Sequence, residues 1–234
     1  MKNRPFFLLS ILAMLALLLI GKLMNSKVAD AKVVTPECYR TPIMALEFSQ
    51  DAAMINTIFK LPEPDSLVRV SKTKRFVSAT DLDYLYILAY ALFMLLFALQ
   101  CNYFWKKGFI WAILLTLLAA LSDVMENAQL MKIFKLVAAG ETDYSGIFET
   151  LRFWTALKFF SIGAFFLALA PFFWRSNWLG KVVVTTAALA LGCWAMACFY
   201  QPEFWADVLF GMIFLLFAGA ILLGLTFKTR PSSN

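Results

Sequence analysis

The sequence predicts an all-α integral membrane protein: a bundle of six transmembrane helices with one further, extracytoplasmic amphipathic helix. Hydrophobic residues make up 62% of the 234 residues and charged residues 15%, whereas a soluble domain contains about 45–50% and about 25%. The mean hydropathy is +0.74. Six apolar stretches approach or reach the about 20 residues that a helix needs to cross a bilayer. These values exclude a soluble enzyme, a disordered chain and a nucleic-acid-binding module.

The apolar stretches are expected to be helices because backbone that faces lipid must satisfy its hydrogen bonds within the segment. They cover residues 6–24, 82–105, 109–130, 153–174, 182–200 and 204–227. The predicted organisation is a first transmembrane helix at 1–24, an extracytoplasmic loop at 25–80, five further transmembrane helices at 81–230 and a cytoplasmic tail at 231–234. An A-x-A-like site at 29–31 also suits a cleaved signal peptide. That site lies well beyond the apolar stretch, which favours a retained signal anchor.

The distribution of basic residues predicts a membrane protein with both termini in the cytoplasm. Eight Lys and Arg residues adjoin the spans on the cytoplasmic side, and three adjoin them in short outer loops. The eight are Lys2, Arg4, Lys106, Lys107, Arg175, Lys181, Lys228 and Arg230, and the three are Lys132, Lys135 and Arg152. This asymmetry explains the net charge of +6 without a nucleic-acid partner. The expected partners are membrane lipids and, as a second class, other membrane proteins.

The loop at residues 25–80 contains the predicted amphipathic helix. Thr41 suits an N-cap and Pro42 the first helical position. Apolar residues then recur at helical spacings over about residues 42–59. Glu47 and Asp51 are four residues apart and therefore share one face of this helix. We expect the helix to rest as a lid on the membrane surface or on the bundle.

The residue types that are missing narrow the chemistry. The chain has no His, which excludes His-ligated zinc and ligation of haem by His. Its four Cys residues include no C-x-x-C pair of the thioredoxin type. Cys38 and Cys198 are predicted to lie on the same side of the membrane. A disulfide between them is one interpretation, and two free thiols are the other.

The third predicted span contains charged residues, which are costly in a membrane and therefore mark candidates for function. Asp123, Glu126 and Asn127 fall on one helical face at spacings of three and four residues. Thr116 and Ala119 continue this face, and small residues there let a neighbouring helix approach closely. The face is therefore expected to point into the bundle rather than toward lipid.

Other segments bring polar side chains to the same outer level of the predicted bundle. Together with the third span they form one candidate site for a ligand. Its predicted members are Glu47, Asp83, Tyr86, Tyr90, Asp123, Glu126, Asn127 and Lys158. Close carboxylates repel one another, so such a cluster must take up protons, pair with a lysine or bind a cation. If a metal binds, oxygen ligands such as Asp83, Asp123 and Glu126 suit a divalent Ca²⁺, Mg²⁺ or Mn²⁺ ion.

Four short motifs in this order resemble those of a widespread group of small bacterial multi-pass membrane proteins. That group has an L-E-[LF]-[AS] segment, an L-D-[FY] segment with a downstream Tyr, a D-x-x-E-N stripe and a following K-F. The corresponding residues here are Ala45-Leu46-Glu47-Phe48, Leu82-Asp83-Tyr84-Leu85-Tyr86 with Tyr90, Leu121-Ser122-Asp123-Val124-Met125-Glu126-Asn127, and Ala156-Leu157-Lys158-Phe159. The resemblance covers about residues 42–165. It implies that these residues act as one unit, but it implies no activity.

The sequence leaves several functions open. The first hypothesis is an inner-membrane protein whose acidic outer-leaflet pocket binds a lipid headgroup, a small ligand or a cation. The second is a membrane enzyme that acts on a lipid-linked substrate by carboxylate acid–base or metal-assisted chemistry. A transporter is the third, although the sequence has no inverted repeat of the kind that many transporters show. A purely structural network of salt bridges is the alternative to all three.

Overall fold

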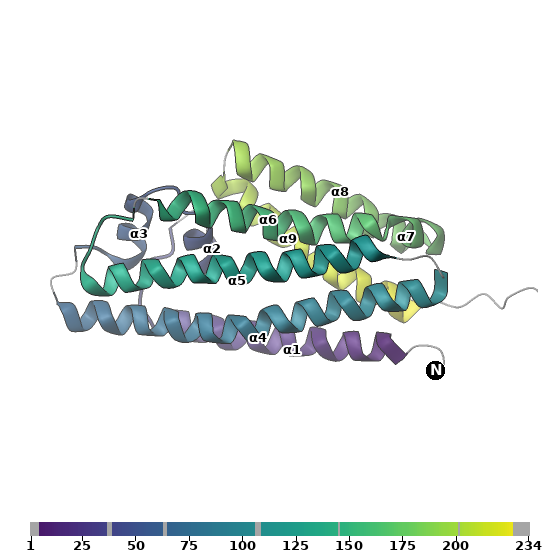
Figure 1. The fold of residues 1–234 in the computed structure, drawn as a ribbon, viewed down its shortest axis with the longest axis horizontal. Helices are drawn as coiled ribbons and strands as arrows, with labels where there is room; N and C mark the ends of the chain where they lie inside the picture. The colour runs from purple at the N-terminus through teal and green to yellow at the C-terminus, as the bar shows by residue number, and fades with distance from the viewer. Residues whose placement is uncertain are drawn as a thin grey trace, which may run out of the picture.

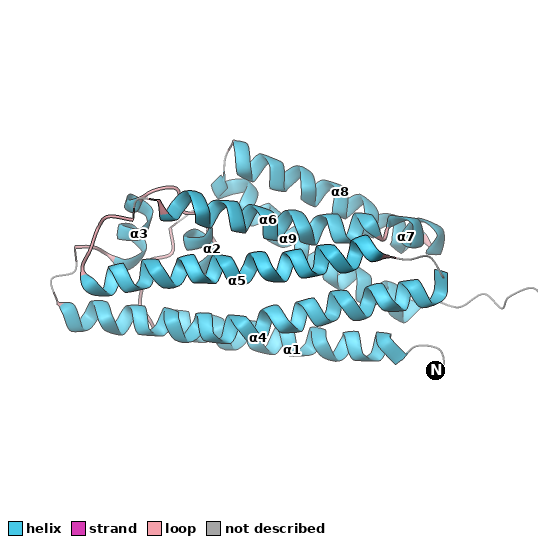
Figure 2. Ribbon diagram, viewed as in Figure 1, coloured by secondary structure: helices cyan, strands magenta, loops and turns pink. Residues whose placement is uncertain are grey.

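The computed structural model of the chain describes residues 5–36, 39–62, 65–105, 109–144, 146–200 and 202–226. Within these ranges the regular structure is entirely helical, as Figure 2 shows. The helices are α1 (Pro5–Ala29), α2 (Pro42–Glu47), α3 (Ala52–Phe59), α4 (Ser66–Trp105), α5 (Ile110–Ala139), α6 (Ile147–Ala168), α7 (Ala170–Ser176), α8 (Trp178–Phe199) and α9 (Pro202–Thr226).

Six of these helices are long and apolar enough to cross a membrane, which confirms the predicted fold class. They are α1, α4, α5, α6, α8 and α9, and they run along the long axis of the molecule (Figure 1). Large apolar side chains such as Leu88, Trp111 and Leu117 are exposed on their outer faces. Exposed apolar surface of this kind is what lipid-facing helices require.

The long helices pack in chain order. α1 lies against α4, α4 against α5, α5 against α6, α6 against α8, and α8 against α9. α5 packs between α4 and α6, with Ala112, Thr116 and Ala119 on its buried face. Small side chains at this spacing allow close helix approach. Among the described residues, the backbones of α1 and α9 approach each other at isolated points at most.

The helix predicted over residues 42–59 is interrupted, so the expectation of one continuous helix is wrong. α2 begins as predicted, because the Thr41 side chain accepts a hydrogen bond from the Met44 backbone N–H at 3.2 Å. The chain leaves α2 after Glu47, and Asp51 starts α3 by accepting a bond from the Met54 N–H at 3.0 Å. Asp51 is an exposed N-cap. It therefore does not share a helical face with Glu47.

Two predicted boundaries also differ from the structure. α4 begins at Ser66 rather than at residue 82, because residues 66–80 are helical and not loop. Lys72, Phe76 and Ala79 are buried at helical spacing in this segment, so it is an amphipathic extension of the span. The span predicted over 153–174 is divided between α6 and α7, and Pro171 lies in the first turn of α7.

One end of the bundle carries a compact extension that we call the cap. The cap consists of α2, α3, residues 66–80 of α4 and residues 130–139 of α5, and it lies at the left in Figure 1. Its core contains Phe59, Phe76 and Phe134, with ring centroids 5.1 to 6.3 Å apart. The Lys72 ammonium donates to the Phe59 carbonyl at the end of α3 at 2.9 Å, a favourable place for a cation. The core of the cap thereby joins α3 to α4 and α5, and α2 contacts α3, α5 and α6.

Candidate functional site

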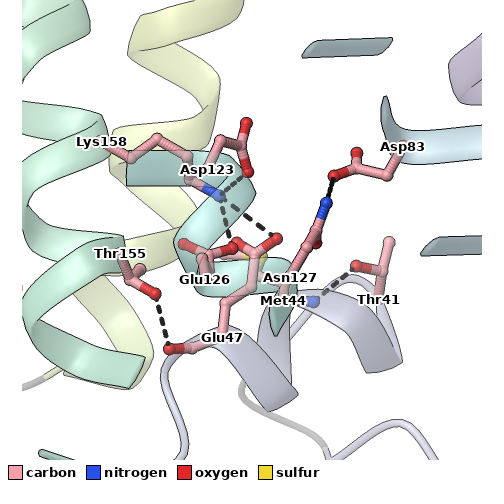
Figure 3. Close-up of polar contacts among 9 residues, drawn as sticks. All are labelled: Thr41, Met44, Glu47, Asp83, Asp123, Glu126, Asn127, Thr155 and Lys158. Atoms are coloured by element: carbon pink, nitrogen blue, oxygen red, sulfur yellow. Dashed lines mark hydrogen bonds and ion pairs between the residues drawn. The ribbon is translucent and has the colours of Figure 1, made fainter. Parts of the chain in front are cut away.

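Lys158 of α6 lies at the centre of the candidate site. Its ammonium is 2.7 Å from Glu126 Oε1, 3.3 Å from Asp123 Oδ1 and 3.5 Å from Glu47 Oε1, as Figure 3 shows. The Lys158 side chain is 7% exposed and that of Glu126 1%. The structure therefore brings together four of the predicted residues, from three different helices.

The spacing on α5 explains how this helix serves two neighbours. Asp123 and Glu126 are one turn apart and point toward Lys158 of α6 (Figure 3). Asn127, the next residue round the helix, points toward α4 instead. Its Nδ2 donates to Asp83 Oδ2 at 2.6 Å. The stripe predicted on α5 therefore links α6 and α4 through one buried face.

α2 inserts Glu47 into the bundle. The last four residues of α2 are buried, and the Thr155 hydroxyl of α6 donates to the Glu47 carbonyl at 3.3 Å. The ring of Phe48, the next residue, stacks on that of Phe159 with centroids 5.8 Å apart. Burial raises the pKa of Glu47 from its usual 4.5 to about 7, the Lys158 ammonium acting in the opposite direction. Glu47 is thus a member of the cluster rather than a residue above it.

The depth of the site follows from the neighbouring helix α8. The Trp194 indole N–H donates to the Ala156 carbonyl at 2.7 Å, so these two residues lie at the same level. α8 ends at Phe199, five residues beyond Trp194, or about 7.5 Å at 1.5 Å per residue. Lys158 is two residues deeper than Ala156, which places it about 10 Å from that end of the bundle. Lys158 is also eleven residues from Ile147, the first residue of α6, so the site lies inside the bundle and not at its end.

The site contains more negative groups than positive ones. It has four carboxylates, from Glu47, Asp83, Asp123 and Glu126. Among the described residues, the cation that pairs with this cluster is the Lys158 ammonium. Glu47 Oε2 and Glu126 Oε2 are buried and have no hydrogen-bond partner among the described residues. Uncompensated charge is expensive where water is excluded. The cluster is therefore incomplete as a salt-bridge network, and protons or a further cation must balance it.

A cavity of about 230 Å³ adjoins the cluster, and we call it the acidic cavity. Its polar lining is Glu47, Asp83, Tyr86, Tyr90, Asp123 and Lys158. Its apolar lining comes mainly from α1 and α9. A second cavity of about 410 Å³, the adjoining cavity, shares Glu47, Asp83 and Tyr86 with it and extends to Arg40 and Thr41 beside the cap. Together the two cavities offer the volume of an ordinary ligand pocket.

Both predicted tyrosines line the acidic cavity. The rings of Tyr86 and Tyr90 meet edge to face, with centroids 6.2 Å apart. The Tyr90 hydroxyl is buried close to Asp123, but it makes no well-formed hydrogen bond within the described part of the chain. A buried hydroxyl without a good partner is available to a ligand. All eight predicted site residues therefore belong to one cluster or to the cavity beside it.

The predicted metal ligands are not assembled as a set. No group of three or more carboxylate or thiolate side chains in the described ranges is placed to hold a metal ion. The Lys158 ammonium lies between Asp123 and Glu126, and Asp83 is held by Asn127. A lysine in this position repels a divalent ion electrostatically.

Sequence reasoning missed several residues of the site region. Arg40 lines the adjoining cavity and forms an ion pair with Asp207 of α9, Nε to Oδ1, at 2.6 Å. Phe210 and Phe214 of α9 line both cavities, although the sequence indicated only lipid-facing phenylalanines in this span. Of the two predicted disulfide partners, Cys198 is a free cysteine and Cys38 lies outside the described residues.

Comparison of the chain with protein-family models, with curated proteins and with solved structures finds no match. The resemblance of its four motifs to those of small bacterial membrane proteins therefore stays a prediction. The functional argument rests on the geometry and the charges of the site.

Proposed function

We propose that this membrane protein binds a positively charged group, carried by a lipid headgroup or a small organic ligand, in the acidic cavity. We place it in the bacterial cytoplasmic membrane with both termini in the cytoplasm, as its basic residues suggest. The observation that carries the proposal is the excess of buried carboxylates over ammonium groups beside an open cavity. A bound cation restores the balance of charge without breaking an existing contact.

Asp83 and Glu47 are the side chains that hold this group. Lys158 is engaged most closely by Glu126, at 2.7 Å, and by Asp123, at 3.3 Å. Asp83 has no cationic partner among the described residues, is half-buried and lines both cavities. Glu47 reaches Lys158 only through Oε1, at 3.5 Å, which leaves Oε2 without a partner in that part of the chain. An ammonium between these two carboxylates would donate charge-assisted hydrogen bonds to both.

The remaining lining suits an organic cation better than a bare metal ion. Tyr86, Tyr90 and Phe159 contribute aromatic rings to the acidic cavity, and α9 contributes further phenylalanines. Aromatic faces attract ammonium groups and pack against their apolar substituents. A metal ion would instead require several oxygen ligands at short distance.

An enzyme acting on a lipid-linked substrate is the second candidate, and one contact favours it. The Tyr90 hydroxyl lies close to the Asp123 carboxylate at the wall of the acidic cavity. Such a pair can exchange a proton with a bound substrate. Recovery of a chemically altered ligand after incubation with the purified protein would favour this function over binding alone.

The proposal is tested with two compounds that differ in charge but share one apolar body. The melting temperature of the detergent-solubilised protein is measured at pH 7 with benzylamine and with benzyl alcohol. At ten times its Kd a ligand stabilises by about 1.4 kcal/mol, which corresponds to about 3–6 °C for a chain of this size. We expect this rise with benzylamine and none with benzyl alcohol.

Matched aspartate variants locate the effect. Asp83→Asn removes the charge, while its amide oxygen still accepts the bond from Asn127 Nδ2. Asp81→Asn is the control, because Asp81 is an exposed residue of the same helix and lines neither cavity. We expect the benzylamine effect to disappear in Asp83→Asn and to persist in Asp81→Asn. Equal shifts for the amine and the alcohol would overturn the proposal.

A further inference from the structure

The first and last long helices, α1 and α9, are not closely packed neighbours in the described part of the chain. α1 packs on α4 and α9 packs on α8, so these two helices end the series of neighbours. In Figure 1, α1 follows α4 and α9 crosses behind α5. Both cavities are lined by residues of α1 and of α9. Both cavities, and the carboxylates in them, therefore adjoin the seam between α1 and α9.

The two sides of the acidic cavity differ in polarity. The side formed by α2, α4, α5 and α6 carries the carboxylates, the tyrosine hydroxyls and Lys158. The side formed by α1 and α9 is apolar, with Met14 and Leu17 from α1 and phenylalanines from α9. Phe214 lines both cavities and is nevertheless 57% exposed, so it lies at the edge of the cavities. Such a cavity fits an amphiphile whose head is polar and whose tail remains in the membrane.

The adjoining cavity has charges of both signs at separate places. Arg40 lines it beside the cap, and Asp83 and Glu47 line it at the level of the cluster. An approaching free amine would meet the Arg40 guanidinium from the cap side, which is unfavourable. A headgroup with a phosphate and an ammonium instead complements both charges, because Arg40 contacts Asp207 through Nε and its guanidinium has further N–H donors. Arginine is well suited to phosphate, and the carboxylates are suited to the ammonium.

From this arrangement, and resting on the proposed function, we infer that the ligand is a glycerophospholipid with a zwitterionic, primary-ammonium headgroup. It enters sideways between α1 and α9. Its ammonium lies between Asp83 and Glu47, its phosphate lies near Arg40, and its acyl chains pass Phe214 into the bilayer.

The test uses the full-length protein in nanodiscs of equimolar phosphatidylethanolamine and phosphatidylglycerol. Native mass spectrometry then measures which lipid stays bound to the protein after the protein is released from the nanodisc. We expect phosphatidylethanolamine to be retained about tenfold over phosphatidylglycerol, since one charge-assisted contact corresponds to that ratio. Water-soluble phosphoethanolamine, without acyl chains, should compete poorly for the site.

Variants of the arginine separate this inference from the proposed function. Arg40→Gln should reduce the retention of phosphatidylethanolamine several-fold while leaving the benzylamine stabilisation at least as large as in wild type. The double variant Arg40→Gln/Asp207→Asn removes both charges of this ion pair, so no carboxylate is left unpaired. It should show the same reduced retention as Arg40→Gln, which would exclude misfolding caused by an unpaired Asp207 as the reason. Arg75→Gln is the control, because Arg75 and its partner Asp30 are an exposed pair that lines neither cavity.

Each pattern of results has one meaning. Equal retention of the two lipids, with benzylamine still stabilising, overturns the lipid inference and leaves the proposed function standing. Binding of phosphoethanolamine as tight as that of the lipid overturns lateral entry in the same way. If lipid retention and the benzylamine shift in melting temperature are both the same in wild type and in Asp83→Asn, the inference and the proposed function are both wrong.

Discussion

The Lys158 ammonium lies 2.7 Å from Glu126 Oε1, and this ion pair joins α6 to α5 where both side chains are almost fully buried. Asp123 and Glu47 share the same ammonium at longer distances. A buried ion pair of this kind contributes specificity more than net stability, because desolvation offsets the attraction. Removing one partner is nevertheless costly, since the other charges are then buried without compensation.

Replacing Lys158 should therefore destabilise the protein strongly. Lys158→Met leaves three carboxylates without their common cation, and the loss of one partner of a buried pair costs about 3–5 kcal/mol. Adding Glu126→Gln removes the closest carboxylate charge and should restore part of the stability. The melting temperature in detergent measures both variants. Lys135→Met, at an exposed position of α5, is the control. A Lys158→Met protein as stable as this control would contradict the described pairing.

The raised pKa of Glu47 predicts a dependence of stability on pH. Its pKa is about 7 in the folded protein and 4.5 when unperturbed, burial being the main cause. Between these values the folded state binds more protons than the unfolded state. The contribution of Glu47 to the free energy of unfolding is therefore full below about pH 4.5 and is lost as the pH rises through 7. The loss is at most about 3 kcal/mol.

Glu47→Gln isolates this contribution, because the amide does not titrate. The stability of wild type relative to Glu47→Gln should fall as the pH rises from about 5 to about 8. Melting temperatures across this range provide the measurement. Glu141→Gln, at an exposed position before α6, controls for the rest of the chain. A difference that is constant with pH, or that grows as the pH rises, would show that burial does not disfavour the Glu47 carboxylate.

The cap should depend on its aromatic core. Phe76 is 1% exposed and lies within 5.1 Å of Phe59 and 5.4 Å of Phe134, measured between ring centroids. Phe76→Ala should therefore cost about 3–5 kcal/mol. Leu67→Ala, on the exposed face of the same segment, should change stability by less than about 0.5 kcal/mol. If both variants melt together, the cap is not packed as described.

Helical spacing in the sequence places Asp123, Glu126 and Asn127 on one face, and these three residues are buried in α5. Counting along the spans then puts Lys158 at the same level. Spacing could not indicate which neighbour each side chain contacts, and Asn127 in fact reaches Asp83 of α4. That choice depends on how α4 and α6 pack on either side of α5.

The cap, and the apolar side of the acidic cavity formed by α1 and α9, were harder to predict, for different reasons. Hydropathy marks where a span becomes polar, but α4 continues as an amphipathic helix from Ser66. The chain breaks after Glu47 because Asp51 is the N-cap of a new helix. Apolar spacing alone does not distinguish this arrangement from one continuous helix. Phe210 and Phe214 look like any lipid-facing phenylalanine until the packing of α1 and α9 is known.

The proposed orientation can be checked without purification. Reporter fusions placed after Gly140 and after Lys107 should report the outside and the inside of the cytoplasmic membrane respectively. The physical reason is the excess of Lys and Arg at the ends that we assign to the cytoplasm. The opposite pattern would place the cap, and the site beneath it, at the cytoplasmic face.

The most direct test of the central claim identifies what the cavity holds in its own membrane. The protein is purified from native membranes in mild detergent as wild type, Asp83→Asn and Asp81→Asn, and co-purified molecules are extracted and identified by mass spectrometry. We predict an amine-bearing molecule at near-stoichiometric amount with wild type and Asp81→Asn. With Asp83→Asn it should fall about tenfold, as expected for one lost charge-assisted contact. An anionic or neutral molecule retained equally by all three proteins would contradict the claim.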